Sequence, residues 1–192
     1  MTLEAGASSP PWTREGKQHV AAATHRWLEK VVLGLRLCPF AAVPFARGQI
    51  RYRVSGATTT QGLAEELARE LTHLHSADPE LCETSLLIHP YVLTDFLDYN
   101  QFLDEADAAI AALGFRGELQ IASFHPDYQF AGSAPSDVQN CSNRSPYPML
   151  HLLREASVAR AVELYPEVGE IGERNMATLV ELGHEGWLAL LR

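Results

Sequence analysis

Two histidines follow two apolar segments in the same way, and their side chains are the first candidates for chemistry. The segments are Leu87-Ile88-His89-Pro90 and Ser123-Phe124-His125-Pro126, each typical of a strand that ends at a His-Pro pair. An imidazole titrates near neutral pH and can therefore exchange a proton with a substrate. We expect His125 to act as the general acid or base, and His89 to orient the substrate or assist.

A polar segment, 126–145, follows the second histidine and supplies candidate binding groups. Segments this long without periodicity are usually functional. Arg144 precedes Ser145 and Pro146, a pair typical of the N-cap and first residue of a helix. An arginine beside a helix N-terminus attracts a carboxylate or a phosphate. The expected substrate-binding residues are Arg144, Ser145, Asn143, Tyr128, Gln129, His151 and Arg154.

The same polar segment has a purely structural interpretation. Asn and Gln side chains often hold a loop by bonding its own backbone. In that case Arg144 would pair with Asp137 or Glu155 rather than with a substrate.

A metal site is a further alternative for the histidines. His89 and His125, with His151 or Asp127, would give two imidazoles and a third ligand. The sequence contains neither an HExxH nor a CxxC spacing, and we expect neither a metal nor another cofactor.

The three cysteines, Cys38, Cys82 and Cys141, are odd in number and lack metal-ligand spacing. We expect reduced thiols and a cytoplasmic protein. Cys141, close to Arg144 in sequence, is a minor candidate for a nucleophile with His125 as its base. Cys38 lies in an apolar stretch, where a buried structural thiol is the default.

Charge and hydropathy narrow the class of partner. The net charge of −9 argues against nucleic acid, whose binding needs a basic patch. Apolar runs fall short of the roughly 20 residues that span a bilayer, so we expect no membrane partner. The expected partner is a small anionic molecule, and the oligomeric state is left open. We expect a disordered tail over 1–12 and one domain over 13–192.

Hydrophobic periodicity predicts the elements that position these residues. The expected helices cover about 13–35, 58–77, 94–113 and 145–164, with one or two more at the C-terminus, and the expected strands cover 49–54, 84–89 and 118–124. Strands that alternate with helices indicate an α/β fold with a small, three- to four-stranded, largely parallel sheet. The alternative is a ferredoxin-like α+β fold with an antiparallel sheet and one more strand. In a parallel sheet, both His-Pro pairs lie at the carboxyl edge, where such sheets bind ligands.

Four stretches together resemble a known family. They are Leu37-Cys38-Pro39-Phe40, the region from His89-Pro90-Tyr91 to Asn100, the region from Ser123 to Gly132, and Asn143-Arg144-Ser145-Pro146 into Glu155. Over about residues 15–185 the chain resembles the bacterial family catalogued as domain of unknown function 1415. The resemblance implies a free-standing cytoplasmic protein and supplies no catalytic residue.

Two functions from different classes follow from these observations. The first is a small-molecule enzyme that acts on a carboxylate- or phosphate-bearing substrate, with a histidine as acid or base. The second is a ligand- or partner-binding regulatory protein without turnover. Its contact anchors would be aromatic residues of the loops, such as Tyr91, Tyr128, Phe130 and Tyr147.

Overall fold

The computed structural model describes residues 13–164 and 168–191, and the tail expected over 1–12 lies outside these ranges. The described α-helices are α1 (Arg14–Trp27), α2 (Ala42–Ala46), α3 (Thr60–Ser76), α4 (Phe96–Ala112), α5 (Glu155–Leu164) and α6 (Ile171–Leu190). The described strands are β1 (Ile50–Val54), β2 (Thr84–Ile88), β3 (Leu119–Phe124) and β4 (Met149–Arg154). Shorter helical segments are η1 (Leu28–Leu33), η2 (Pro39–Ala41), η3 (Val138–Ser142) and η4 (Val168–Glu170).

The four strands form one mixed sheet in the order β1-β2-β4-β3. β1 and β2 are parallel, whereas β4 is antiparallel to both β2 and β3. The α/β class predicted from the sequence is confirmed, but the prediction of a largely parallel sheet is wrong. The sheet is mixed because Met149–Arg154, which was expected to be helical, forms a strand between β2 and β3 and runs antiparallel to both. The sheet also differs from the ferredoxin-like alternative, which is antiparallel, because β1 and β2 are parallel.

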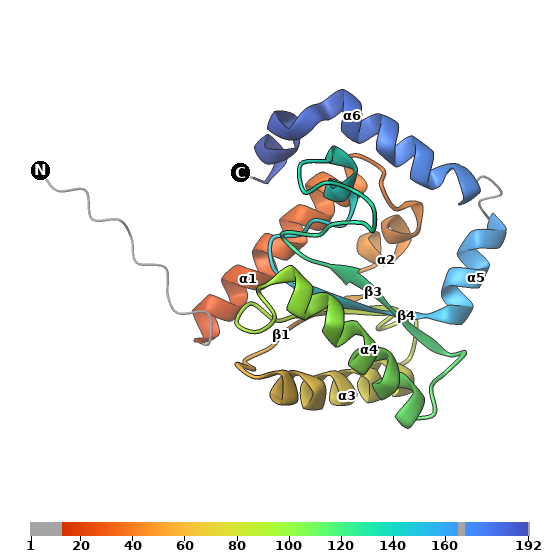
Figure 1. Cartoon of the computed structure of the whole chain (residues 1–192). Coiled ribbons are helices and arrows are strands. Elements are labelled where there is room, and N and C mark those ends of the chain that lie inside the picture. The colour runs from red at the N-terminus through yellow and green to blue at the C-terminus, as the bar shows by residue number, and fades with distance from the viewer. Residues whose placement is uncertain (1–12, 165–167, 192) are drawn as a thin grey trace, which may run out of the picture.

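Helices cover both faces of the sheet. Figure 1 shows α3 and α4 on one side and α1, α2 and α6 on the other, with α5 at the end of β4. On the α3/α4 face, the leucines of α3 and the apolar side chains of α4 pack against alternate strand residues such as Leu87, Leu119 and Leu150. On the opposite face, Val20, Trp27 and their neighbours on α1 and η1 pack against the other strand positions. The two faces therefore have separate cores, as the alternation of side chains along a strand requires.

The long helices form where the sequence pattern predicts them. In α3, Leu63, Leu67, Leu71 and Leu74 recur at helical spacing, and all four are fully buried. The N-cap Thr59 accepts a hydrogen bond from the N–H of Gly62 at 3.1 Å, which satisfies one of the free donors at the start of this helix.

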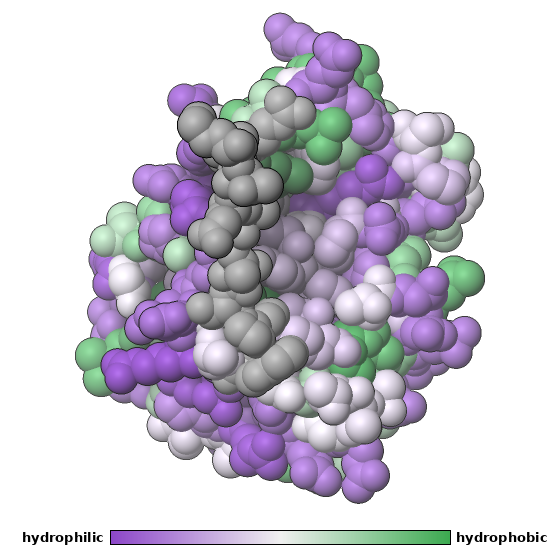
Figure 2. All heavy atoms as spheres, turned by 90° about the vertical axis from the view of Figure 1, so that its left-hand side faces the viewer, coloured by the Kyte–Doolittle hydropathy of each residue, from purple (hydrophilic) through white to green (hydrophobic). Residues whose placement is uncertain are grey.

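None of the described helices combines the length and apolar character that crossing a bilayer requires. Figure 2 shows hydrophilic residues over most of the visible face, with apolar residues in small separate groups.

Candidate functional site

The structure brings His89 and His125 to the same edge of the sheet. They follow β2 and β3, which point in the same direction on either side of β4. The ring of Tyr99 on α4 lies 5.8 Å from that of His89 and 5.1 Å from that of His125, measured between centroids. Both imidazoles are fully buried, so their shared edge is part of the core.

Backbone contacts show which ring nitrogen of each histidine carries a proton. Nδ1 of His89 lies 2.9 Å from the carbonyl of Val92, and Nε2 of His125 lies 3.2 Å from the carbonyl of Leu93. A carbonyl only accepts, so each of these nitrogens carries the proton. The N–H of Asp127 donates to Nδ1 of His125 at 3.0 Å, which requires that nitrogen to be unprotonated. Desolvation lowers the pKa of His89 to about 4 and also lowers the pKa of His125.

These two histidines clamp the turn between β2 and α4. They hold two successive carbonyls, those of Val92 and Leu93, and Leu93 adopts a positive φ of 57°, which is unfavourable for a leucine. Neither imidazole lines the two cavities described below. Their geometry therefore supports a structural role more directly than contact with a substrate.

Arg144 and Ser145 do not stand at a helix N-terminus, so that part of the expected anion site is wrong. The chain runs from Ser145 into β4, and the hydroxyl of Ser145 donates to the carbonyl of Tyr147 at 2.7 Å. The guanidinium of Arg144 donates to the carbonyl of Pro135 at 2.7 Å and to that of Tyr128 at 3.3 Å. Arg144 therefore binds the backbone of its own loop.

The polar loop is held together by its amide side chains. Asn140 is fully buried, and its Oδ1 accepts from the N–H of Phe130 at 3.0 Å and from the hydroxyl of Ser133 at 2.8 Å. Gln129 donates to the carbonyl of Ser133, and Asn143 donates to the carbonyl of Ser123 at 3.1 Å. This arrangement matches the structural interpretation of the loop, except that Arg144 binds carbonyls rather than Asp137 or Glu155.

Other expected binding residues lie apart from one another. The ring of Tyr128 packs against Phe96 and Phe130, with centroids at 5.2 and 5.0 Å. Arg154, at the end of β4, donates from Nη2 to carbonyls at the end of α3, whereas His151 lies on the opposite face of the same strand. Within the described ranges, no group of three metal-ligating side chains is placed to hold an ion.

A cavity of about 340 Å³ lies against the sheet face opposite α3 and α4, and we call it the sheet-face cavity. Its lining is mostly apolar and comes from the strands, from α1 and η1, from the segment around η2, and from α5. The lining residues are Trp27, Leu28, Val32, Cys38, Phe40, Ala41, Pro44, Ile50, Glu83, Thr84, Leu86, Gln120, Ala122, Phe124, His151, Leu153, Arg154, Ser157, Val158 and Ala161. A second, more open hollow of about 840 Å³ is lined by residues of η3 and α6 and by Asn143.

His151 is oriented in the sheet-face cavity by Thr84. The hydroxyl of Thr84 lies 2.6 Å from the carbonyl of Leu152 and 2.8 Å from Nε2 of His151. Because the carbonyl takes the hydroxyl proton, Nε2 of His151 must donate to the Thr84 oxygen. Nδ1 of His151 is then an unprotonated acceptor, and it makes no hydrogen bond within the described part of the chain. Desolvation lowers the pKa of His151 to about 4, so the ring is neutral at pH 7.

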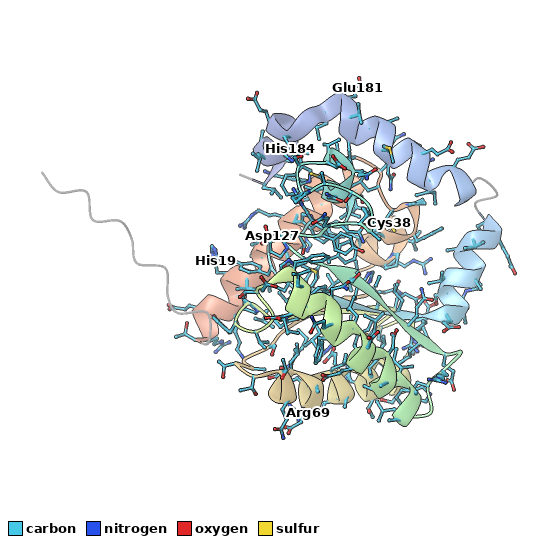
Figure 3. All side chains as sticks on the ribbon, viewed as in Figure 1. His19, Cys38, Arg69, Asp127, Glu181 and His184 are labelled. Carbon is cyan, nitrogen blue, oxygen red and sulfur yellow. The ribbon has the colours of Figure 1, made fainter. Side chains whose placement is uncertain are left out.

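Cys38 brings a thiol to the same cavity. It immediately precedes η2 and is partly buried, whereas Cys82 and Cys141 are buried. Figure 3 shows Cys38 inside the outline of the ribbon, while Arg69 and Glu181 project outwards. Burial raises the pKa of Cys38, and the N–H groups of Phe40 and Ala41 oppose this rise in part. The thiol expected to be buried and structural is therefore the cysteine that lines a cavity.

We expect iodoacetamide to alkylate Cys38 well before the other two cysteines in the folded protein. Only the thiolate reacts, and the raised pKa keeps its population small at pH 7. The rate should therefore still increase between pH 8 and pH 9, where an ordinary thiol begins to level off. Peptide mass spectrometry identifies the labelled residue, and Cys38→Ser should remove the early label. Labelling of Cys82 or Cys141 at the same rate would show that reagent does not enter through the cavity.

The sequence pattern did not single out the sheet-face cavity or Thr84. The residues that line the cavity are scattered over most of the chain. Thr84 is the first residue of a strand, where threonine is common for reasons unrelated to a site. The alternation along β3 was the available signal, because Gln120, Ala122 and Phe124 share one face.

Comparison with known proteins gives a family and no activity. A family model described as protein of unknown function (DUF1415) matches residues 19–189. No curated protein and no solved structure matches the chain.

Proposed function

The chain belongs to the DUF1415 family, whose description assigns no activity, and from its geometry we propose that the protein binds a small molecule in the sheet-face cavity. The observation that carries the proposal is the cavity itself. It is about 340 Å³ in volume and mostly apolar, with a few polar groups that include His151. Ligand sites typically have this size and this composition.

His151 is suited to orient such a ligand. Its ring is fixed by Thr84, and its Nδ1 accepts no hydrogen bond from the described residues. A general base works best with a pKa near the working pH. The pKa of His151, about 4, lies well below pH 7, so the ring is better suited to accept a hydrogen bond than to take a proton. This favours the binding protein over the enzyme of the two classes expected from the sequence.

A small-molecule enzyme is the second candidate. Cys38 and His151 line the same cavity, and a thiol with a nearby imidazole is the pairing used in nucleophilic catalysis. An anionic substrate held by Arg144 gains no support from its contacts, because the guanidinium binds the carbonyls of Tyr128 and Pro135.

A cavity-filling substitution tests the binding proposal. Ala122 lies beside His151 in the β3–β4 register and lines the cavity, whereas Ala159 on α5 is exposed. We expect fragments detected by ligand-observed NMR to lose binding in Ala122→Leu and to keep it in Ala159→Leu. The amide spectrum of each variant verifies its fold. Fragments that bind equally well to both variants, or a complete lack of binders, would contradict the proposal.

The same fragments distinguish the two candidates. A binding protein should return each fragment unchanged after prolonged incubation, and Cys38→Ser should bind it as tightly as the wild type. Chemical conversion of a fragment that stops in both Cys38→Ser and His151→Gln would favour the enzyme.

A further inference from the structure

We infer that the ligand of the sheet-face cavity is an uncharged, largely apolar molecule that presents one hydroxyl or N–H donor to Nδ1 of His151. This inference rests on the proposed function and names its ligand class. It depends on the tautomer of His151, on the charges around the cavity, and on the character of its walls.

The tautomer determines the polarity of the contact. Thr84 is buried, and its hydroxyl proton goes to the carbonyl of Leu152 at 2.6 Å, so its oxygen can only accept from His151. This leaves Nδ1 as the ring's remaining hydrogen-bonding atom, with a lone pair and no proton. A ligand that offers only acceptors, such as an ether or a ketone, finds no donor on this ring.

The surrounding charges disfavour an anion. His151 is neutral at pH 7, and Glu83 is the acidic residue of the lining. Arg154 also borders the cavity, and its Nε is buried without a hydrogen-bond partner among the described residues. Its Nη2, however, donates to the carbonyls of Leu74, Ala77 and Cys82, which holds the guanidinium toward the opposite face of the sheet. A carboxylate in the cavity would therefore lose its hydration and regain little of it from this arginine.

The walls favour an apolar body. The rings of Trp27, Phe40 and Phe124 and the aliphatic side chains of Leu86 and Leu153 are among the lining. At about 340 Å³, the cavity is at the small end of known ligand sites. A compact alkylphenol therefore has the right combination of body and donor to serve as a probe.

The test compares four matched compounds by NMR titration: 4-propylphenol, 4-propylanisole, propylbenzene and 4-propylbenzoate. We expect 4-propylphenol to bind about tenfold more tightly than 4-propylanisole, which cannot donate, in line with one net hydrogen bond. We expect 4-propylbenzoate to bind more weakly than propylbenzene. Equal affinities for the phenol and the anisole, or tightest binding of the benzoate, would overturn the inference while leaving a binding cavity in place.

Thr84→Val tests the effect of the His151 tautomer on ligand preference without changing the shape of the cavity. The substitution keeps the side-chain shape and removes the oxygen that accepts from Nε2 of His151. The preference for the phenol over the anisole should fall to within about threefold, while propylbenzene binds as before. Imidazole ¹⁵N shifts should show a protonated Nε2 in the wild type and a mixture of tautomers in the variant. A protonated Nδ1 in the wild type would overturn the inference.

His151→Phe provides a second variant in case Thr84→Val folds poorly. It removes the acceptor and keeps a ring at that position, and it too should abolish the phenol preference. If no fragment shows binding to the wild type that Ala122→Leu abolishes, the proposed function fails along with the inference. If such fragments bind but none of the four compounds binds, the inference alone fails. If propylbenzene binds without any preference for a donor, the inference alone fails.

Discussion

Lowering the pH from 7 to 5 should reduce the free energy of unfolding by about 3 to 4 kcal/mol. Burial lowers the pKa of both His89 and His151 to about 4 in the folded protein, against about 6.5 in an unfolded chain. Between pH 7 and 5 the unfolded state therefore binds more protons than the folded state does. The stabilisation is fully present above pH 6.5 and declines as the pH falls toward 4. Urea unfolding at pH 7, 6 and 5, followed by circular dichroism, measures the change.

The environment of each histidine determines its share of this loss. His89 faces His125, which lowers its pKa further, and burial lowers the pKa of His125 as well. Asp95 and Asp127 act on His125 in the opposite direction, so we assign its contribution only a sign. His151→Gln should remove about half of the pH dependence. His73→Gln should leave it intact, because His73 is exposed and makes no side-chain hydrogen bond within the described residues. If the free energy of unfolding is the same at pH 7 and pH 5, the folded protein binds protons at its buried histidines as readily as the unfolded chain does, and the prediction is wrong.

The helices α1, α3 and α4 and the first three strands were predictable because each has a pattern of its own. The leucines of α3 recur at helical spacing, and Thr84–Ile88 is a short, fully buried and mostly apolar run. The strand β4 was missed because Leu150 and Leu153 also fit a helix. Pro148 was a signal against that helix, because proline disfavours the helical conformation in the residue before it. Pairing with β2 and β3 on both sides then fixes the segment as a strand.

The convergence of the two His-Pro pairs was also foreseeable, but their environment was not. Strand direction alone places His89 and His125 at one edge of the sheet. The two rings are covered by Tyr99 and by the carbonyls of Val92 and Leu93. These carbonyls belong to the turn after β2, and no local sequence pattern predicts the path of that turn. For the same reason the sequence suggested acid–base chemistry where the contacts favour a clamp.

Replacing Arg154 with methionine should reduce the free energy of unfolding by about 3 kcal/mol. Nη2 of Arg154 donates to the carbonyls of Leu74 at 2.6 Å, Ala77 at 2.8 Å and Cys82 at 3.2 Å. The first two belong to the C-terminal end of α3, where free carbonyls and the helix dipole favour a cation. A hydrogen bond to a charged group contributes about 1.5 to 3 kcal/mol, and methionine keeps the apolar stem while it removes the whole cap.

Two other substitutions decide whether this role belongs to Arg154 itself. Arg154→Lys keeps the charge and loses the planar array of donors, so it should fall between the wild type and Arg154→Met. Arg160→Met, on the exposed side of α5, removes one bond to the hydroxyl of Ser157 and should cost no more than about 0.5 kcal/mol. Urea unfolding at pH 7 compares the four proteins. If Arg154→Met lowers the free energy of unfolding by less than about 1 kcal/mol, the guanidinium is not needed to cap α3. The anion-binding role expected from the sequence would then be the better explanation of this arginine.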